Sequence, residues 1–229
     1  MVKELKEAKR SVLILTLITM LLVITLGGLL IYIGDIFEHA QIRYKKPQEI
    51  NITIDSEFTS YEIKTIQQAL EQYNELENIE IGSMTVGKFN KKADIMITPV
   101  REEAQYYDSD DFPNALGCNY HKIKGGKIKG GKITKSIITI NKKLLAVYAN
   151  TQAKASLILS GSEIPFEHFY NNYLTSVTLH EFGHTLGMPD LMDDMYFNKS
   201  IMHYANFELI ELTEYDKGSI EARYRSETK

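Results

Sequence analysis

The stretch that decides the fold reads His180-Glu181-Phe182-Gly183-His184-Thr185-Leu186-Gly187-Met188-Pro189-Asp190. It closes a helical pattern over residues 166–186, and Gly187 is of the residue type that most often ends a helix. Side chains four positions apart share one face of a helix, so His180 and His184 can direct two imidazoles at one metal ion. A catalytic metal needs a third protein ligand and one open position. Asp190, beyond the turn at Gly187, is predicted to supply that ligand.

Glu181 directly follows the first histidine, so its carboxylate can reach a metal-bound water without binding the metal itself. Two histidines at this spacing, with a glutamate after the first, form a known zinc-hydrolase pattern. Two imidazole nitrogens and one carboxylate oxygen also suit Zn²⁺. The sequence therefore predicts Zn²⁺ as cofactor, bound by His180, His184 and Asp190, with Glu181 as general base. No binding site for another cofactor is predicted.

A second motif follows downstream: Ser200-Ile201-Met202-His203-Tyr204. Together the two segments resemble the metzincin clan of zinc endopeptidases, which has an extended zinc helix and a methionine-bearing turn (Met-turn) beneath the metal. The aspartate ligand is similar to that of snapalysin-like members, and the Met-turn is similar to that of astacin-like members. The resemblance implies that Met202 forms the apolar floor of the site. It also implies that the phenol of Tyr204 approaches the zinc or the reaction intermediate.

The resemblance extends more weakly over the rest of the chain. Residues 93–97 resemble the third strand of matrixin-like peptidases, and residues 212–216 resemble the start of their C-terminal helix. The implied fold is α+β: a metzincin-like catalytic domain over residues 50–229, with a mixed twisted sheet, a zinc-binding helix and a C-terminal helix. The implied activity is zinc-dependent endopeptidase, in which a zinc-activated water hydrolyses a peptide bond of a protein or peptide substrate. Residues 117–120 are expected to bind that substrate as an added strand.

Local patterns agree with an α+β domain. Strands are expected at residues 51–54, 79–86, 93–97 and 136–140, since each is short and apolar or alternating. A helix capped by Ser56 or Thr59 is expected to reach about residue 76, and another is expected at 213–224. Residues 122–131 contain a near-repeat of lysine, isoleucine and paired glycines. Its simplest interpretation is a solvated hairpin tip; the alternative is a basic exosite for an acidic partner.

The N-terminus predicts a membrane anchor. Residues 11–33 carry no charge, and about 20 apolar residues suffice for a helix to cross a bilayer. Lys3, Lys6, Lys9 and Arg10 precede this stretch, which favours a cytoplasmic N-terminus. The expected layout is a cytoplasmic tail (1–10), a transmembrane anchor (11–33), a juxtamembrane linker (34–49) and an extracellular peptidase domain (50–229), single-pass in the cell membrane. The alternative is a cleaved signal peptide and a secreted protein.

Composition narrows the function further. A net charge of -4 argues against nucleic acid as a partner, since the phosphate backbone requires a basic face. Two other functions remain open. One is a gluzincin-type peptidase, in which Glu208 or Glu211 is the third ligand. The other is a catalytically silent surface binding domain that keeps its zinc for structure. Oligomeric state does not follow from the sequence.

Overall fold

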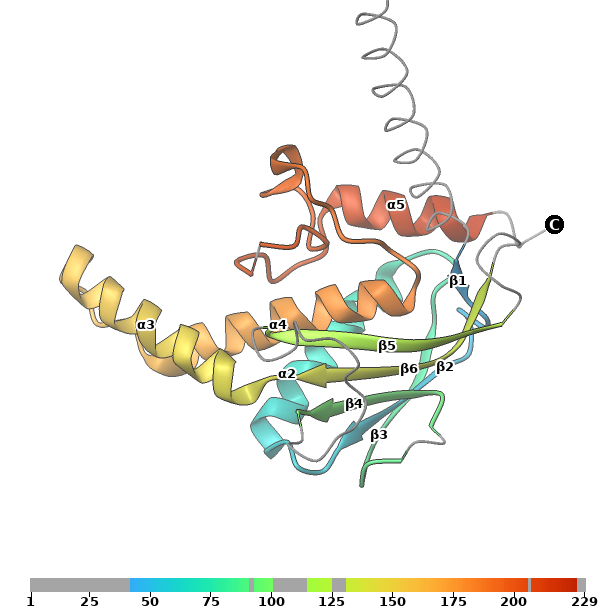
Figure 1. Cartoon of the computed structure of the whole chain (residues 1–229), viewed down its shortest axis with the longest axis horizontal. Helices are drawn as coiled ribbons and strands as arrows, with labels where there is room; N and C mark the ends of the chain where they lie inside the picture. Colours follow the sequence, from blue (N-terminus) through green and yellow to red (C-terminus); the bar gives the residue numbers. More distant parts are fainter. Residues whose placement is uncertain (1–41, 91–92, 101–114, 125–130, 206, 226–229) are drawn as a thin grey trace, which may run out of the picture. The chain divides into compact units, whose positions relative to one another are not determined.

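The computed structural model describes residues 42–90, 93–100, 115–124, 131–205 and 207–225, which belong to one compact unit running from residue 40 to residue 229. The strands are β1 (Arg43–Tyr44), β2 (Ile50–Asp55), β3 (Ile81–Gly87), β4 (Ile95–Pro99), β5 (Gly117–Lys124) and β6 (Lys132–Ile140). The helices are α2 (Ser60–Glu71), α3 (Lys142–Ser160), α4 (Phe166–Thr185) and α5 (Glu214–Tyr224), with short 3-10 turns η1 (Gln72–Glu75) and η4 (Asp194–Tyr196) (Figure 1).

The strands form one mixed sheet, as predicted. Along the sheet the order is β3-β2-β4-β6-β5, and all of these neighbours are parallel except β5 and β6, which are antiparallel. Residues 136–140 of β6 pair with β4 on one side and with β5 on the other. The short β1 pairs in parallel with the start of β6. Among the described residues, no strand pairs with the outer side of β5, so β5 is an edge of the sheet.

Helix α2 begins where the sequence predicts. The Thr59 side chain accepts a hydrogen bond from the Glu62 N–H at 3.2 Å, and the Glu62 carboxylate accepts one from the Thr59 N–H at 2.7 Å. This reciprocal capping box satisfies two backbone donors that a helix start leaves without partners. The buried face of α2, which includes Ile66 and Leu70, packs against the central helix α4.

Helix α4 is the centre of the unit, since it contacts α2, α3, β5 and β6. From Tyr173 onward nearly every residue of α4 is buried, including the polar ones. A polar network fixes the helix to the sheet: the Asn119 amide of β5 donates to the Glu181 carbonyl and to Thr185 Oγ1, and Ser136 of β6 hydrogen-bonds to both Asn119 and Thr185. Because each of these buried polar groups has a partner, the contact is specific as well as compact.

The α+β domain prediction is confirmed in its elements, with one helix missed. Each predicted strand and helix is present within a few residues of its expected bounds, but α3 was not predicted. Residues 43 and 44 pair with β6, so the sheet begins earlier than the expected boundary at residue 50. The predicted tail, anchor and first part of the linker lie outside the described residues.

The fold-class prediction is corrected at one point, the transmembrane helix placed before the catalytic domain. In the part of the chain that the structure describes, no helix has both the length and the apolar character needed to cross a bilayer. The long helices α3 and α4 carry charged side chains such as Lys154 and Glu181 along their length. The expectation that the domain lies outside the cell stays a prediction.

Candidate metal centre

The end of α4 brings the ligand-bearing segments together. The Met188 N–H donates to the Gly183 carbonyl at 3.0 Å, and the Gly187 N–H donates to the His184 carbonyl at 2.9 Å. These two bonds form a Schellman motif, in which the residue after the helix adopts a left-handed conformation. Gly187 does so, with φ of 88°. A Cβ added there would also lie 2.1 Å from the carbonyl oxygen of Ile42, so only glycine fits.

Beyond this turn, Asp190 meets the two histidines. The Nε2 atoms of His180 and His184 lie 3.1 Å apart, and Asp190 Oδ1 lies 3.1 Å from the first and 3.4 Å from the second. Ligands placed tetrahedrally at the usual zinc distances are separated by roughly 3.3–3.4 Å. In the described part of the chain this is the single group of three or more possible metal-binding side chains. Its spacing and its donor atoms both fit Zn²⁺.

The other nitrogen of each imidazole is held by the backbone. His180 Nδ1 lies 2.7 Å from the Ile201 carbonyl oxygen, and His184 Nδ1 lies 2.7 Å from the Met188 carbonyl oxygen. A carbonyl can only accept, so each Nδ1 carries a hydrogen, and each Nε2 is the nitrogen that faces the centre and can bind a metal. Such outer contacts orient metal-binding histidines and raise their basicity. They set the tautomer that a metal requires.

The protonation states of His184 and Asp190 depend on each other. Burial lowers the pKa of His184, but the carboxylates of Asp190 and Glu181 outweigh that effect and raise it to about 9. Burial raises the pKa of Asp190, yet hydrogen bonds and attraction from both histidines hold it well below its usual range. In the metal-free protein, His184 is therefore protonated and forms an ion pair with Asp190.

Glu181 is buried beside this centre but is not one of its three ligands. Its side chain lies against Gly117, the first residue of the edge strand β5. A Cβ added to Gly117 would come within 2.8 Å of both Cγ and Oε1 of Glu181 and within 2.6 Å of Val177 Cγ1. Burial raises the pKa of Glu181, and the two histidines only partly offset this. A buried carboxylate with a raised pKa accepts protons more readily than an ordinary one, as a general base must.

Met202 packs against helix α4 at Gly183, and its role as the floor of the site stays a prediction. Its side chain is 1% exposed, and its sulfur would lie 2.4 Å from a Cβ added to Gly183, one residue before His184. The segment is also tied to the ligand loop, since the Leu191 N–H donates to the Met202 carbonyl at 2.8 Å. The absence of a side chain at Gly183 thus leaves the space that Met202 fills.

The sequence interpretation missed the residue that holds the Met-turn in place. The buried carboxylate of Asp216, in the first turn of α5, accepts hydrogen bonds from the Ser200 hydroxyl and the Ile201 N–H, and also from the N–H and hydroxyl of Thr213. The Met202 N–H in turn donates to Ser200 Oγ at 3.0 Å. Thr213 three residues before Asp216 is a helix-capping pattern, so sequence could have placed the cap but not its contact with Ser200.

The other residues of interest are not among the three ligands. Neither Glu208 nor Glu211 belongs to the group of metal-binding side chains. His203 is buried, and its Nδ1 accepts a hydrogen bond from the Ala205 N–H. Tyr204 is 51% exposed; its N–H donates to the Leu191 carbonyl at 3.3 Å, which anchors its backbone next to Asp190. The role of the Tyr204 hydroxyl stays a prediction.

Similarity to known proteins is found among solved structures alone. No model of a known protein family matches the sequence, and no curated protein matches it. Among solved structures, the chain is similar to myroilysin, with 12% identity and a TM-score of 0.42 over 80% of this chain and 95% of that one. It is also similar to high choriolytic enzyme 1, a hatching enzyme zinc-protease from the medaka fish Oryzias latipes, with 13% identity and a TM-score of 0.36 over 80% of this chain and 92% of that one.

By its name, the second of these proteins is a zinc-protease. Neither bears on the finer resemblance to matrixin-like or snapalysin-like members. Identities and TM-scores this low carry no functional conclusion, so the function rests on the geometry of the site.

Proposed function

We propose that this chain is a zinc-dependent endopeptidase. The observation that carries the proposal is the convergence of His180 Nε2, His184 Nε2 and Asp190 Oδ1 at the spacing of zinc ligands. Three protein ligands leave one coordination position open, which distinguishes a catalytic site from a closed structural one. The Asp190 side chain is 43% exposed, so the open position can be reached from solvent.

Zinc at this site would supply Lewis acidity, which polarises a peptide carbonyl and makes water nucleophilic at neutral pH. The chain's own residues supply the proton transfers. Glu181 Oε1 accepts the proton of the attacking water and delivers it to the leaving amine, which its raised pKa favours. The Tyr204 hydroxyl donates a hydrogen bond to the oxyanion of the tetrahedral intermediate.

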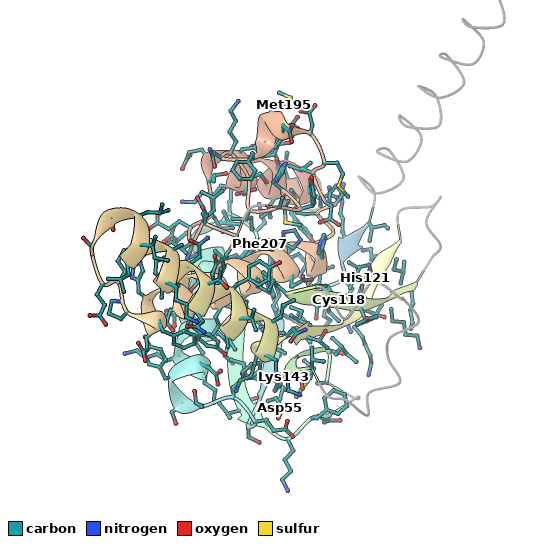
Figure 2. The ribbon with its side chains drawn as sticks, turned by 60° about the vertical axis from the view of Figure 1, so that its left-hand side comes forward. Asp55, Cys118, His121, Lys143, Met195 and Phe207 are labelled. Atoms are coloured by element: carbon teal, nitrogen blue, oxygen red, sulfur yellow. The ribbon has the colours of Figure 1, made fainter. Side chains whose placement is uncertain are left out.

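The substrate is an extended segment of a protein or peptide. The edge strand β5 begins at Gly117, against Glu181, and its outer side pairs with no strand among the described residues. An exposed edge of this kind binds an extended peptide as an additional strand, using main-chain hydrogen bonds. Cys118 and His121 mark the course of this strand (Figure 2). A peptide bound along it would pass close to the general base.

The test is cleavage of casein and of a mixed peptide library by the zinc-loaded full-length chain. Glu181→Gln should retain one zinc per chain and lose cleavage by on the order of 10²-fold or more. Zinc binding with no cleavage by the parent chain would instead favour the silent binding domain.

The third ligand is tested by zinc content. Asp190→Ala should lose zinc, whereas Glu208→Ala and Glu211→Ala, as matched removals of a carboxylate, should keep it. Loss of zinc in either glutamate variant, with zinc kept in the aspartate variant, would favour the gluzincin-type site.

A further inference from the structure

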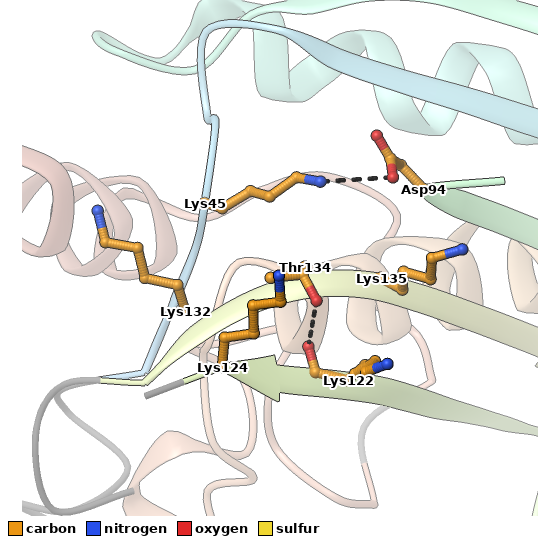
Figure 3. A pocket seen from close by; sticks show the side chains of 7 residues that line it. All are labelled: Lys45, Asp94, Lys122, Lys124, Lys132, Thr134 and Lys135. Carbon is orange, nitrogen blue, oxygen red and sulfur yellow. Dashed lines mark hydrogen bonds and ion pairs between the residues drawn. The ribbon is translucent and has the colours of Figure 1, made fainter. Parts of the chain in front are cut away.

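A second site lies at the far end of β5. There a pocket of about 660 Å³ is lined by five lysines, one aspartate and one threonine: Lys45, Lys122, Lys124, Lys132, Lys135, Asp94 and Thr134 (Figure 3). Its size is that of ligand-binding pockets in general. Five lysines against one aspartate leave the lining strongly positive, although the whole chain has a net charge of -4. The concentration of positive charge is therefore local.

Strand geometry puts four of these lysines on one face of the sheet. Lys122 lies opposite Lys135, and Lys124 lies opposite Lys132, in the antiparallel pair β5–β6. Residues two apart on a strand share a face, and so do directly opposed residues on neighbouring strands. The four ammonium groups therefore belong to the same face.

A β-bulge makes this arrangement possible. Lys132 and Lys135 are three positions apart, so in a regular strand they would point to opposite faces. The register of β6 against β5 shifts between Lys122 and Ile123, leaving Thr134 as the extra residue, and its hydroxyl donates to the Lys122 carbonyl at 3.1 Å. Bulges re-aim side chains in this way, often near functional sites. Like charges that face each other across strands destabilise a sheet. An anion bound on this face would be attracted by the lysine charges.

The pocket and the general base Glu181 both lie beside strand β5. Lys122 and Lys124 come five and seven residues after Gly117, which lies against Glu181. At the rise of an antiparallel strand this separates them from Gly117 by roughly 17 and 24 Å. A peptide paired with the outer side of β5 would therefore extend from the general base to the lysines.

We propose that the lysine pocket is an exosite for an acidic segment of the protein substrate, about five to seven residues on the N-terminal side of the cleaved bond. This inference rests on the proposed peptidase function. The side follows from the antiparallel arrangement, the more stable way to add a strand, in which the N-terminal part of the peptide runs toward Lys124. The pocket is concave and includes Lys122 and Lys124 of the edge strand β5, so a strand-forming peptide fits it better than a flat membrane or a duplex.

The first experiment measures cleavage by the zinc-loaded full-length chain. The starting point is a peptide from the library that the chain cleaves. One version is extended with three glutamates placed five to seven residues N-terminal to the cleaved bond. A matched version carries three glutamines at the same positions. We expect the acidic peptide to have about tenfold higher kcat/KM, and to lose that advantage at about 0.5 M salt, where charges are screened within a few ångströms. Equal rates, or an advantage only for glutamates on the C-terminal side, would overturn the proposal.

Variants assign the effect to the pocket. Lys122→Gln combined with Lys124→Gln should reduce the acidic-to-neutral ratio of kcat/KM to below about threefold. Using a ratio cancels any general loss of activity. Lys64→Gln combined with Lys154→Gln removes the same charge from two exposed lysines on helices outside the pocket, and should leave the ratio unchanged. The same fall in both double variants would mean that only net charge matters, which contradicts an exosite.

A binding measurement separates the two proposals. Fluorescence anisotropy of a labelled hexaglutamate peptide with the Glu181→Ala chain requires no cleavage, and we expect saturable binding that weakens at least about fivefold when Lys122 and Lys124 are glutamine. Stronger binding of an oligothymidylate of equal charge, or of anionic vesicles, would overturn an acidic peptide as the occupant. Acidic-peptide binding without cleavage by the parent chain would refute the peptidase and leave the anion site standing. Cleavage with no acidic-peptide effect would refute the exosite alone.

Discussion

The contact between Gly183 and Met202 offers a quantitative test of how the floor of the metal centre is built. A Cβ added to Gly183 would lie 2.4 Å from the Met202 sulfur, over 1 Å inside the roughly 3.5–4.0 Å at which such atoms normally touch. Met202 is 1% exposed, so the sulfur has little room to retreat. Overpacking of this kind costs about 1–3 kcal/mol. Replacing glycine by alanine inside a helix stabilises by about 1 kcal/mol, so Gly183→Ala should destabilise the fold by about 0–2 kcal/mol.

A double-mutant cycle isolates the overlap. Met202→Ala alone should destabilise by about 2–5 kcal/mol, through lost burial and the cavity it leaves. In the double variant the added methyl group meets no sulfur, so the chain should be about 1–3 kcal/mol more stable than the sum of the two single effects predicts. The assay is equilibrium urea unfolding of the metal-free full-length chain.

Gly218→Ala provides the control for helix propensity. Gly218 lies inside α5, and a Cβ added there would meet no atom within 4 Å. This variant should be more stable than the parent by about 0.5–1 kcal/mol. If the effects of Gly183→Ala and Met202→Ala add to within about 0.5 kcal/mol, the two residues are not in contact and the described floor is incorrect.

Four further predictions concern the same centre. Gly187→Ala should lower the free energy of unfolding by about 3 kcal/mol or more, measured by urea unfolding. The reason is that φ of 88° disfavours a side chain and that the methyl group would meet the Ile42 backbone. A decrease below about 1 kcal/mol would contradict that contact. Glu181→Gln should make the metal-free chain more stable at pH 7, since burial raises the pKa of this carboxyl and disfavours its charged form. The gain in stability should vanish below about pH 4, where the carboxyl is protonated in both the folded and the unfolded chain. No gain at pH 7 would refute the raised pKa of Glu181. Zinc affinity should rise by up to about tenfold per pH unit until about pH 9 and then level off, because His184 must lose its proton to bind metal. In the metal-free chain, the stability from pairing His184 with Asp190 should be lost as pH rises from 6.5 through about 9. Zinc binding at pH 7 should release the His184 proton. Calorimetry that shows no proton release would refute the pairing.

The approach of the three proposed zinc ligands could be predicted from sequence because their geometry is local. A helix fixes the relation between His180 and His184, and one glycine-terminated turn brings back Asp190. Glu181 and Met202 were predicted by motif, and both are buried next to the ligand-bearing end of α4. What could not be predicted is contact between segments distant in the sequence, such as that of Asp216 with the Met-turn, since no local pattern specifies it.

The helix α3 was missed for a different reason. Its apolar residues do not repeat on one face: only Leu145 and Ala149 are buried, while Leu157, Ile158 and Leu159 are consecutive and exposed. The 3.6-residue periodicity that identifies an amphipathic helix is therefore absent. Tertiary contact with α4, rather than its own pattern, places this helix.

The lysine-rich segment shows that strand register could not be predicted from the sequence. The simplest interpretation placed residues 122–131 on a solvated hairpin tip, but Lys122 and Lys124 belong to β5. The face that they share with Lys132 and Lys135 depends on the bulge at Thr134, which no residue type indicates. Register is set by pairing between strands, so a one-residue shift changes which side chains meet.

The most direct test of the central claim is X-ray absorption spectroscopy of the full-length chain loaded with one equivalent of zinc. The account predicts two imidazole nitrogens, one carboxylate oxygen and one water oxygen at about 2.0–2.2 Å, with the carboxylate contribution lost in Asp190→Ala. A sulfur ligand at about 2.3 Å, four protein ligands with no water, or a spectrum unchanged by Asp190→Ala would contradict it.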